Sequence, residues 1–462
     1  MPPARAVSGG WMLRHAVRMR TDPLGFLVDC AAPLGALVEL PIPRQRVFVV
    51  NDPDAITRVL QGNHSAYGKQ TIQYRSLALV TGEGLLVSEG EEWLRGRRLV
   101  QPAFHQRTLD AVGDHVADAI DRLFATWAAL LDGLLDGAVD GAVVDVDAAM
   151  MRTTLEVVGH ALFATDLGPE ADRIVEAVVA ALDQVIARAR SPLPLPRTWP
   201  TPGNRRLKRS VDQLDASVAE LVRARRAVST GAAASGADLL GLLLDPSSSA
   251  SDQEVRDQVV TLVVAGHETV ASALTWAWWL VAGHGVVADR LAAESAAVLG
   301  GRRPTFADVA RLPYARQVLD EALRLYPPAW VVTRRVLADD VLAGVPVPAG
   351  ALLIMSTYAL HRNPAVWDRP DAFDPDRFAQ PASAGSAGSA GSSGGGRRGY
   401  LPFGAGPRMC VGRELALVEG VLVLSALAGR YRFQRTPGQV VRADALVTVR
   451  PRGGLPLRIR RR

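Results

Sequence analysis

Apolar residues recur three and four positions apart over most of the chain, which is the spacing of one face of an α-helix. The five prolines between residues 192 and 202 interrupt this pattern and predict a loop. The pattern predicts helices over residues 54–60, 93–99, 109–135, 147–163, 171–189, 205–226, 238–244, 252–288, 290–299, 306–326 and 415–427. Most of the chain is therefore expected to be helical.

Short apolar runs of strand-like composition lie toward the two ends of the chain. Residues 36–50 contain two such runs separated by Pro41 and Pro43, which predicts a short hairpin. After the double proline 327–328 the helical period gives way to further short runs, at residues 336, 341–342, 345–348 and 351–355. The sequence thus predicts a mainly α protein with a minor β portion.

The segment 259–288 is long and apolar enough to cross a bilayer, which takes about 20 apolar residues. It contains one formal charge, Glu268, together with His267 and several threonines and serines. An ionisable pair in a lone membrane helix would be costly, because no second hydrophobic span is present to shield it. We therefore expect a long helix buried on all sides in the middle of a large soluble protein.

The chain is interpreted as one domain spanning residues 1–462. Residues 381–396 form a Gly/Ser/Ala repeat that cannot bury a core, so they predict a flexible surface insert and not a linker between domains. No internal repeat of 20–50 residues is visible.

Composition and charge narrow the class of protein further. With 48% apolar and 21% charged residues, neither a disordered chain nor a small disulfide scaffold fits. The net charge is only +5, and all the basic residues in that balance except Lys69 and Lys208 are arginines. A basic surface of this size is usually only solvated, so we expect no nucleic-acid partner. The arginine-interrupted N-terminus lacks the apolar stretch of a signal peptide, so no membrane anchor is expected. The two cysteines, Cys30 and Cys410, lie near opposite ends of the sequence, which favours a reducing, cytoplasmic location.

Cys410 is the strongest candidate for chemistry. Glycines and a proline surround it, which predicts a tight turn, and a helical pattern begins at Leu415. A cysteine at the start of a helix faces open backbone N–H groups and the positive end of the helix dipole, which stabilise a thiolate. A buried structural cysteine is the alternative. Because no other cysteine or histidine lies close in sequence, a zinc site is excluded, whereas a single thiolate suits the axial position of haem iron.

Phe403, Gly406, Arg408, Cys410 and Gly412 match five positions of the signature Phe-x-x-Gly-x-Arg-x-Cys-x-Gly. On these residues the chain resembles the cytochrome P-450 family of haem-thiolate monooxygenases, and the resemblance covers nearly the whole chain. It implies a triangular helical domain around the buried long helix, and haem b (iron protoporphyrin IX) with Cys410 as the iron ligand.

Residues 265–269, Ala-Gly-His-Glu-Thr, resemble the oxygen-activation motif of the family. The resemblance implies that Ala265 lies at the haem, that Glu268 admits protons and that Thr269 holds the ligand derived from dioxygen. The Thr269 hydroxyl is also placed to bond to the carbonyl of Ala265, four residues earlier, and so to loosen the helix. The alternative is a Glu and a Thr whose hydrogen bonds are simply satisfied in the core.

Glu321 and Arg324 are three residues apart, which places both side chains on one helix face. Other Glu/Arg pairs share this spacing, but only this pair precedes the run Leu-Tyr-Pro-Pro and resembles the Glu-x-x-Arg of the family. Arg377, in the segment 375–378, resembles the arginine that completes the family's Glu-Arg-Arg network. The resemblance implies a structural role for these three residues.

Several arginines are candidates for the haem propionates. Trp93 and Arg97 are four residues apart, so both side chains point the same way along a helix, where they resemble the haem-flanking Trp-x-x-x-Arg. The resemblance assigns the same role to Arg334, with Arg335 as the fallback, and to Arg408. A solvated surface position is the alternative for each.

The resemblance also implies the reaction and its partners. Val264, Ala265, Val331 and Val332 occupy substrate-facing positions, and their apolar character suggests a lipophilic small molecule such as a terpenoid, a fatty acyl chain or a polyketide. O₂ and two electrons from a separate ferredoxin and ferredoxin reductase would hydroxylate or epoxidise it, in secondary or lipid metabolism. Arg397, Arg398 and Arg413 are candidates to meet an acidic ferredoxin, with a merely solvated basic edge as the alternative.

Two other functions stay open at this point. One is a haem-thiolate enzyme that carries out oxidative coupling, dehydrogenation or peroxygenation. The other is a non-enzymatic haem gas sensor, which is disfavoured because no output module is left over in the sequence.

Overall fold

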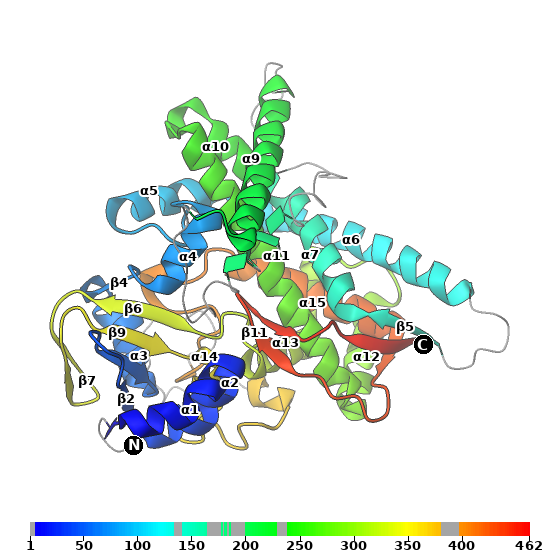
Figure 1. Cartoon of the computed structure of the whole chain (residues 1–462). Coiled ribbons are helices and arrows are strands. Elements are labelled where there is room, and N and C mark those ends of the chain that lie inside the picture. Colours follow the sequence, from blue (N-terminus) through cyan, green and yellow to red (C-terminus); the bar gives the residue numbers. More distant parts are fainter. Residues whose placement is uncertain are drawn as a thin grey trace. The chain divides into compact units, whose positions relative to one another are not determined.

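The computed structural model describes residues 5–133, 141–163, 199–228, 238–379 and 397–462, together with 177–178, 180–182 and 184–185. These residues form two compact units. Figure 1 labels their helices and strands. The first unit comprises Met1–Gln73, Gln317–Cys410 and Val441–Arg452, and the second comprises Tyr74–Arg316, Val411–Val440 and Gly453–Arg462. Each unit is described by itself.

The first unit is built on a six-stranded sheet with the order β1-β2-β3-β9-β6-β4. The strands are β1 (Arg5–Ala6), β2 (Leu37–Leu40), β3 (Val47–Val50), β4 (Tyr67–Gly68), β6 (Val332–Val336) and β9 (Leu352–Met355). The predicted hairpin is confirmed, because β2 and β3 pair antiparallel with Leu37 opposite Val50. All four residues of β3 are buried, and β3 also pairs in parallel with β9, which follows about 300 residues later.

Short elements surround this sheet in the first unit. Its helices are α1 (Gly9–Thr21), α2 (Pro23–Gly25), α3 (Pro53–Thr57) and α14 (Thr357–Leu360), and most of α13 (Pro313–Leu325) also belongs to it. Two small hairpins pair β7 (Asp340–Leu342) with β8 (Val345–Val347) and β11 (Ala443–Ala445) with β12 (Val449–Pro451). Apolar side chains of the sheet, among them Leu37, Phe48 and Leu353, form its core.

The second unit is mainly helical. Its helices are α5 (Gly90–Val100), α6 (Gln106–Asp132), α7 (Val146–Phe163), α9 (Pro202–Val228), α10 (Leu239–Leu244), α11 (Asp252–Ala282), α12 (Gly285–Leu299) and α15 (Arg413–Arg430), with most of α4 (Ile72–Thr81). A three-stranded sheet has the order β10-β13-β5, formed by Tyr431–Gln434, Pro456–Arg461 and Ala142–Asp145. The prediction of a mainly α protein with a minor β portion is confirmed.

Helix α11 is the buried long helix that the sequence predicts. It begins with a capping box, in which Ser251 accepts from the Glu254 amide at 3.2 Å and the Glu254 carboxylate accepts from the Ser251 amide at 2.9 Å. By length and composition it could cross a membrane, but 78% of its most apolar stretch is buried in the protein. Helix α7 packs along it, and Thr154 of α7 donates to the carbonyl of His267 at 3.1 Å.

Two predicted helices are wrong in their extent. The segment 252–288 is not one helix, because Gly283 ends α11 and α12 begins at Gly285. A Cβ at Gly283 would lie 2.3 Å from the guanidinium carbon of Arg435, so a larger residue there would have to displace that side chain. The segment 306–326 is a 3₁₀ turn, Phe306–Arg311, followed by α13, because Pro313 has no amide N–H with which to continue the first helix. The predicted insert 381–396 and most of the predicted helix 171–189 lie outside the described residues.

Glu419, in the middle of α15, is an unexpected feature of the core. Its side chain is fully buried, and neither carboxyl oxygen has a hydrogen-bond partner among the described residues. Burial raises the pKa of Glu419 well above its usual range, because an ionised carboxylate would lose its hydration there without compensation.

This burial predicts a specific dependence of stability on pH. A raised pKa in the folded state means that Glu419 takes up a proton when the protein folds. The free energy of unfolding is therefore not reduced by this group below its unfolded pKa of about 4.3, and it falls as pH rises from there toward the folded pKa. We expect Glu419→Gln to be more stable than wild type at pH 8, with a difference that shrinks by about 1.4 kcal/mol per pH unit on acidification. Urea unfolding measured from pH 5 to pH 9 checks this.

Glu91→Gln is the control, because Glu91 is an exposed carboxylate in the first turn of α5. Its stability should track that of wild type across the range. A wild-type stability that is flat with pH, or equal to that of Glu419→Gln at pH 8, would contradict the prediction.

Candidate active site

Cys410 ends a tight loop of the first unit. The loop passes through a 3₁₀ turn at Gly406–Arg408, and the amide of Cys410 donates to the carbonyl of Phe403 at 3.0 Å. The Cys410 side chain is exposed, and Phe403 and Arg408 are half-buried. Cys30, which is half-buried, lies elsewhere in the first unit, and neither cysteine forms a disulfide in the described part of the chain.

Two glycines of the loop adopt the left-handed conformation for different reasons. Gly404 has φ +72° with nothing within 4 Å of an added Cβ, whereas Gly406 has φ +69° and an added Cβ would lie 2.2 Å from the carbonyl oxygen of Leu60. The chain passes so close to Leu60 that only glycine fits at 406. The signature glycine is thus explained by close backbone approach as well as by its φ angle.

These two glycines form a matched pair for mutation. We expect Gly404→Ala to cost about 1–2 kcal/mol of stability, the penalty of a left-handed alanine alone. Gly406→Ala should cost more, about 2–4 kcal/mol, because it adds the displacement of the Leu60 backbone. Urea unfolding together with measurement of haem content checks both. Equal effects of the two substitutions would show that the contact with Leu60 is unimportant.

Glu321, Arg324 and Arg377 come together in the first unit, as the sequence predicts. Glu321 and Arg324 are fully buried and form a two-pronged ion pair, with Nε to Oε2 at 2.7 Å and Nη2 to Oε1 at 2.8 Å. Arg377 reaches Oε1 of the same carboxylate at 3.3 Å. The remaining N–H groups of Arg324 donate to the backbone carbonyls of His361, Pro370 and Ala372 at 2.5–2.9 Å.

His361 connects this network to the cysteine loop and is a residue that the sequence interpretation missed. Its Nδ1 lies 3.1 Å from the carbonyl of Arg324, and its Nε2 accepts from the amide of Leu401 at 2.9 Å. These partners require a neutral ring protonated at Nδ1, and complete burial agrees with this by lowering the pKa of His361 to about 3. A lone histidine within the segment 361–364 gives no local signal of this role, because its partners lie 37 and 40 residues away.

Strand β6 of the first unit holds the candidate arginine Arg334. Arg334 is 6% exposed, and its guanidinium donates to the carbonyl of Thr333 at 2.9 Å, whereas Arg335 is half-buried. Val331 and Val332 are half-buried at the start of the strand.

Hydrogen bonds from the segment 71–73 hold this strand in place. Thr71 Oγ1 lies 2.7 Å from Thr333 Oγ1, which donates to Gln73 Oε1 at 2.8 Å. The resemblance places parts of the range 67–87 at the substrate pocket, but the sequence did not single out Thr71 or Gln73 within it.

In the second unit, the segment 265–269 lies in the middle of α11. Glu268 is 8% exposed, while Ala265 and Thr269 are half-buried and Val264 is buried. The predicted bond is present, with Thr269 Oγ1 donating to the carbonyl of Ala265 at 2.7 Å. At Gly266 an added Cβ would lie 3.1 Å from Val158 of α7, so this turn is closely packed.

The remaining candidates also belong to the second unit. Trp93 and Arg97 lie on α5, four residues apart and both half-buried, as their spacing predicts. Gly412 precedes the first residue of α15, which begins without a side-chain cap. The candidates are thus divided between the units. Those of the first are Glu321, Arg324, Val331, Val332, Arg334, Arg377, Phe403, Arg408 and Cys410, and those of the second are Trp93, Arg97, Val264, Ala265, Glu268, Thr269 and Gly412.

The chemistry of the donors fits haem. Cys410 supplies one sulfur at an exposed position, which suits a metal whose other ligands come from a macrocycle. The close approach of Gly406 to the carbonyl oxygen of Leu60, which leaves no room for a Cβ, fixes the shape of the loop that carries Cys410. Arg97, Arg334 and Arg408 supply half-buried or buried guanidinium groups of the kind that bind carboxylates.

The basic residues that flank the cysteine segment are less available than the sequence suggests. Arg398 forms a two-pronged pair with Asp54 at 2.9 and 2.7 Å, and Arg413 is 9% exposed and pairs with Glu414 at 3.1 Å. Arg397 lies over the ring of Phe378 at 5.4 Å. An acidic partner would therefore have to compete with existing carboxylates for two of the three.

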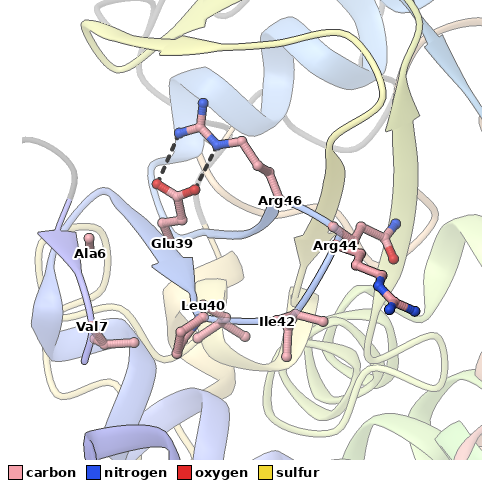
Figure 2. Close-up of a pocket in the computed structure, with 9 residues that line it drawn as sticks. Ala6, Val7, Glu39, Leu40, Ile42, Arg44 and Arg46 are labelled. Carbon is pink, nitrogen blue, oxygen red and sulfur yellow. Dashed lines mark hydrogen bonds and ion pairs between the residues drawn. The ribbon is translucent and has the colours of Figure 1, made fainter. Parts of the chain in front are cut away.

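A cavity of about 460 Å³ opens in the first unit beside the β2–β3 hairpin, and none of the candidate residues lines it. Figure 2 shows it between β1 and the hairpin turn, where Arg46 pairs with Glu39 at 2.7 and 3.0 Å. It is open to solvent and is not part of the candidate active site.

The comparisons with known proteins identify the family. The model of the family Cytochrome P-450 matches residues 5–454, and the chain belongs to this family. The chain is 35% identical over 434 residues to cyclooctatin synthase of Streptomyces melanosporofaciens, an alignment that covers 93% of this chain and 89% of that one. It is 34% identical to cyclooctat-9-en-7-ol 5-monooxygenase of the same organism, covering 92% and 88%. It is also 31% identical to pentalenene oxygenase of Streptomyces avermitilis, covering 94% and 92%.

Solved structures agree with this assignment. The crystal structure of CYP175A1 from Thermus thermophilus matches 99% of this chain and 100% of its own length, with a TM-score of 0.77 and 29% identity. The predicted cytochrome P-450 fold and the monooxygenase class are therefore confirmed, and the enzyme is a haem-iron protein.

Proposed function

We propose that this enzyme hydroxylates or epoxidises a lipophilic, terpenoid-like substrate, with haem b as its cofactor and with Cys410 as the iron ligand. We infer that a separate ferredoxin and its reductase supply the electrons in the cytoplasm. The names of the relatives support the substrate class, because pentalenene and cyclooctat-9-en-7-ol are an unsaturated hydrocarbon and an unsaturated alcohol by name. The apolar candidates Val264, Ala265, Val331 and Val332 agree with such a substrate.

The cofactor, when bound, supplies oxygen activation and C–H or C=C oxidation. The chain supplies binding, water exclusion and protons. We propose that Arg97, Arg334 and Arg408 bind the propionates and that Trp93 adds its indole N–H. The network of Glu321, Arg324 and Arg377, extended by His361, holds the loop that carries Cys410.

The geometry of α11 supports a role for Thr269 in proton delivery. Its hydroxyl proton is held on the carbonyl of Ala265, which leaves the oxygen lone pairs to accept from a water or ligand. The half-buried Thr269 follows the buried Glu268 in the sequence, and we propose that Glu268 is the acid that exchanges protons with it through water. This hydrogen bond is the single observation that carries the assignment.

We expect Thr269→Ala to divert electrons from product to hydrogen peroxide. Product formed per electron pair should fall by about 10²-fold, which is the lower end of what a positioned proton donor contributes. Parallel measurement of electron-donor consumption, product and peroxide checks this. Thr269→Ser keeps the hydroxyl and should stay close to wild type. Unchanged coupling in Thr269→Ala would contradict the assignment.

The proposed reaction is tested with a panel of terpenoid hydrocarbons and alcohols that includes pentalenene. Compounds that bind should shift the haem absorbance, and those turned over under ¹⁸O₂ should gain one labelled oxygen atom. Products that are coupled or dehydrogenated without label would instead favour the alternative haem-thiolate activities. Binding without any consumption of electrons would favour the gas sensor.

A further inference from the structure

Helix α1 of the first unit, Gly9–Thr21, has two faces with different surroundings. One face contacts the protein: Trp11 stacks on His15 at 4.2 Å and approaches Phe26 at 5.9 Å, and Trp11 and Met19 pack on the core that contains Phe26 and Leu27. The opposite face is exposed and carries Gly10, Leu13, Arg14, Val17, Arg20 and Thr21. None of the residues of the helix is buried.

Two large apolar side chains on the outward face of α1 are exposed to solvent. Leu13 is 79% exposed and Val17 is 72% exposed, and because they are four residues apart they project side by side. Isolated exposed apolar residues are common, but here two adjacent ones occupy the middle of one helix face. That face is available for contact with an apolar phase.

The charges on α1 are of one sign and divide between the faces. The helix contains three arginines and no acidic residue. Arg18, at the edge of the protein-facing side, is neutralised by Asp29 and by Asp22 at 3.6 Å. Arg14 and Arg20 flank Leu13 and Val17 on the exposed face, and neither forms an ion pair with a described residue. The outward-facing positive charge is therefore left uncompensated within the described chain.

We propose that helix α1 docks the enzyme on the surface of a bilayer that contains anionic lipid, with Leu13 and Val17 entering the headgroup boundary and Arg14 and Arg20 meeting lipid phosphates. A helix with an apolar stripe, flanking arginines and no acid has the composition of an interfacial helix. A protein partner is disfavoured because two side chains offer far less than the roughly 800 Å² per partner of a stable interface. This inference is independent of the substrate proposed above.

Vesicle sedimentation of the haem-loaded full-length enzyme tests the proposal. The enzyme should bind vesicles of phosphatidylcholine with 30% phosphatidylserine and not vesicles of phosphatidylcholine alone, and the binding should weaken as salt is raised. The double substitution Leu13→Ser with Val17→Ser should weaken binding at least tenfold. Arg14→Gln and Arg20→Gln should each weaken it about fivefold.

The control is Val286→Ser, which changes an apolar residue that is 84% exposed on α12 of the second unit and should leave binding unchanged. All variants should keep the absorbance of the haem-bound protein, because none of the altered side chains is buried. Failure of the wild type to bind the anionic vesicles would overturn the proposal, and so would equal binding by the double variant. A dimer in sedimentation velocity that Leu13→Ser with Val17→Ser dissociates would also overturn it, in favour of self-association.

Discussion

Replacing Cys410 with serine is expected to abolish the red-shifted absorbance band of the reduced, carbon-monoxide-bound enzyme and to reduce substrate oxidation to background. A serine hydroxyl has almost the same size, so the loop held by Gly406 and the Phe403 carbonyl should keep its shape. It lacks the thiolate that, as the proposed iron ligand, would donate electron density to the haem iron. Difference spectra of the purified protein check this directly.

The chain offers an unusually clean control, because Cys30 is the only other cysteine. Cys30 is half-buried and contacts the guanidinium of Arg18 at 3.6 Å, in a part of the first unit that contains no candidate residue. Cys30→Ser should keep both the band and the activity. If Cys410→Ser kept the band as well, the haem-thiolate assignment of this residue would be wrong.

Removing the carboxylate of Glu321 is expected to have the largest effect on stability. Glu321→Ala leaves the guanidinium of Arg324 completely buried without its counter-ion and also takes one partner from Arg377. Breaking a buried pair on one side costs about 3–5 kcal/mol, because the desolvated charge stays behind. We expect a loss of that size in urea unfolding, together with poor haem retention, since the same network reaches the cysteine loop through His361.

Glu220→Ala is the matched control, because Glu220 and Arg223 have the same spacing of three on α9 and a contact of 2.7 Å. Their side chains are 56% and 67% exposed, so the loss should be about 0–1 kcal/mol. Similar losses for the two variants would mean that burial does not determine the strength of the Glu321 pair.

Local sequence was enough to predict those parts of the site whose partners are close in the chain. The spacing of Glu321 and Arg324 and the bond from Thr269 to Ala265 each lie within one helical turn, and both contacts are present. The glycine at 406 could be predicted as a turn residue, but its close approach to Leu60 could not, because that contact joins segments about 350 residues apart.

The features that the sequence did not reveal depend on distant partners. His361 becomes the connection between Arg324 and Leu401 only once three segments meet. Glu419 sits in an ordinary apolar helix pattern, which gives no sign that its carboxyl lacks a partner. The same applies to helix limits: the apolar period continues through Gly283, and only the structure shows that α11 ends there, where Arg435 donates to the carbonyl of Trp279 in the last turn.

The parallel pairing of β3 with β9 has a consequence for how this protein is made. Residues 47–50 leave the ribosome long before residues 352–355, and at roughly 5–20 residues per second the interval is on the order of 15–60 s. During translation, therefore, the fully apolar strand Val-Phe-Val-Val has no neighbour on one side, and an open hydrophobic edge is a template for aggregation. Yield in a heterologous host should accordingly depend on chaperone capacity early in synthesis, well before Cys410 has been added to the nascent chain.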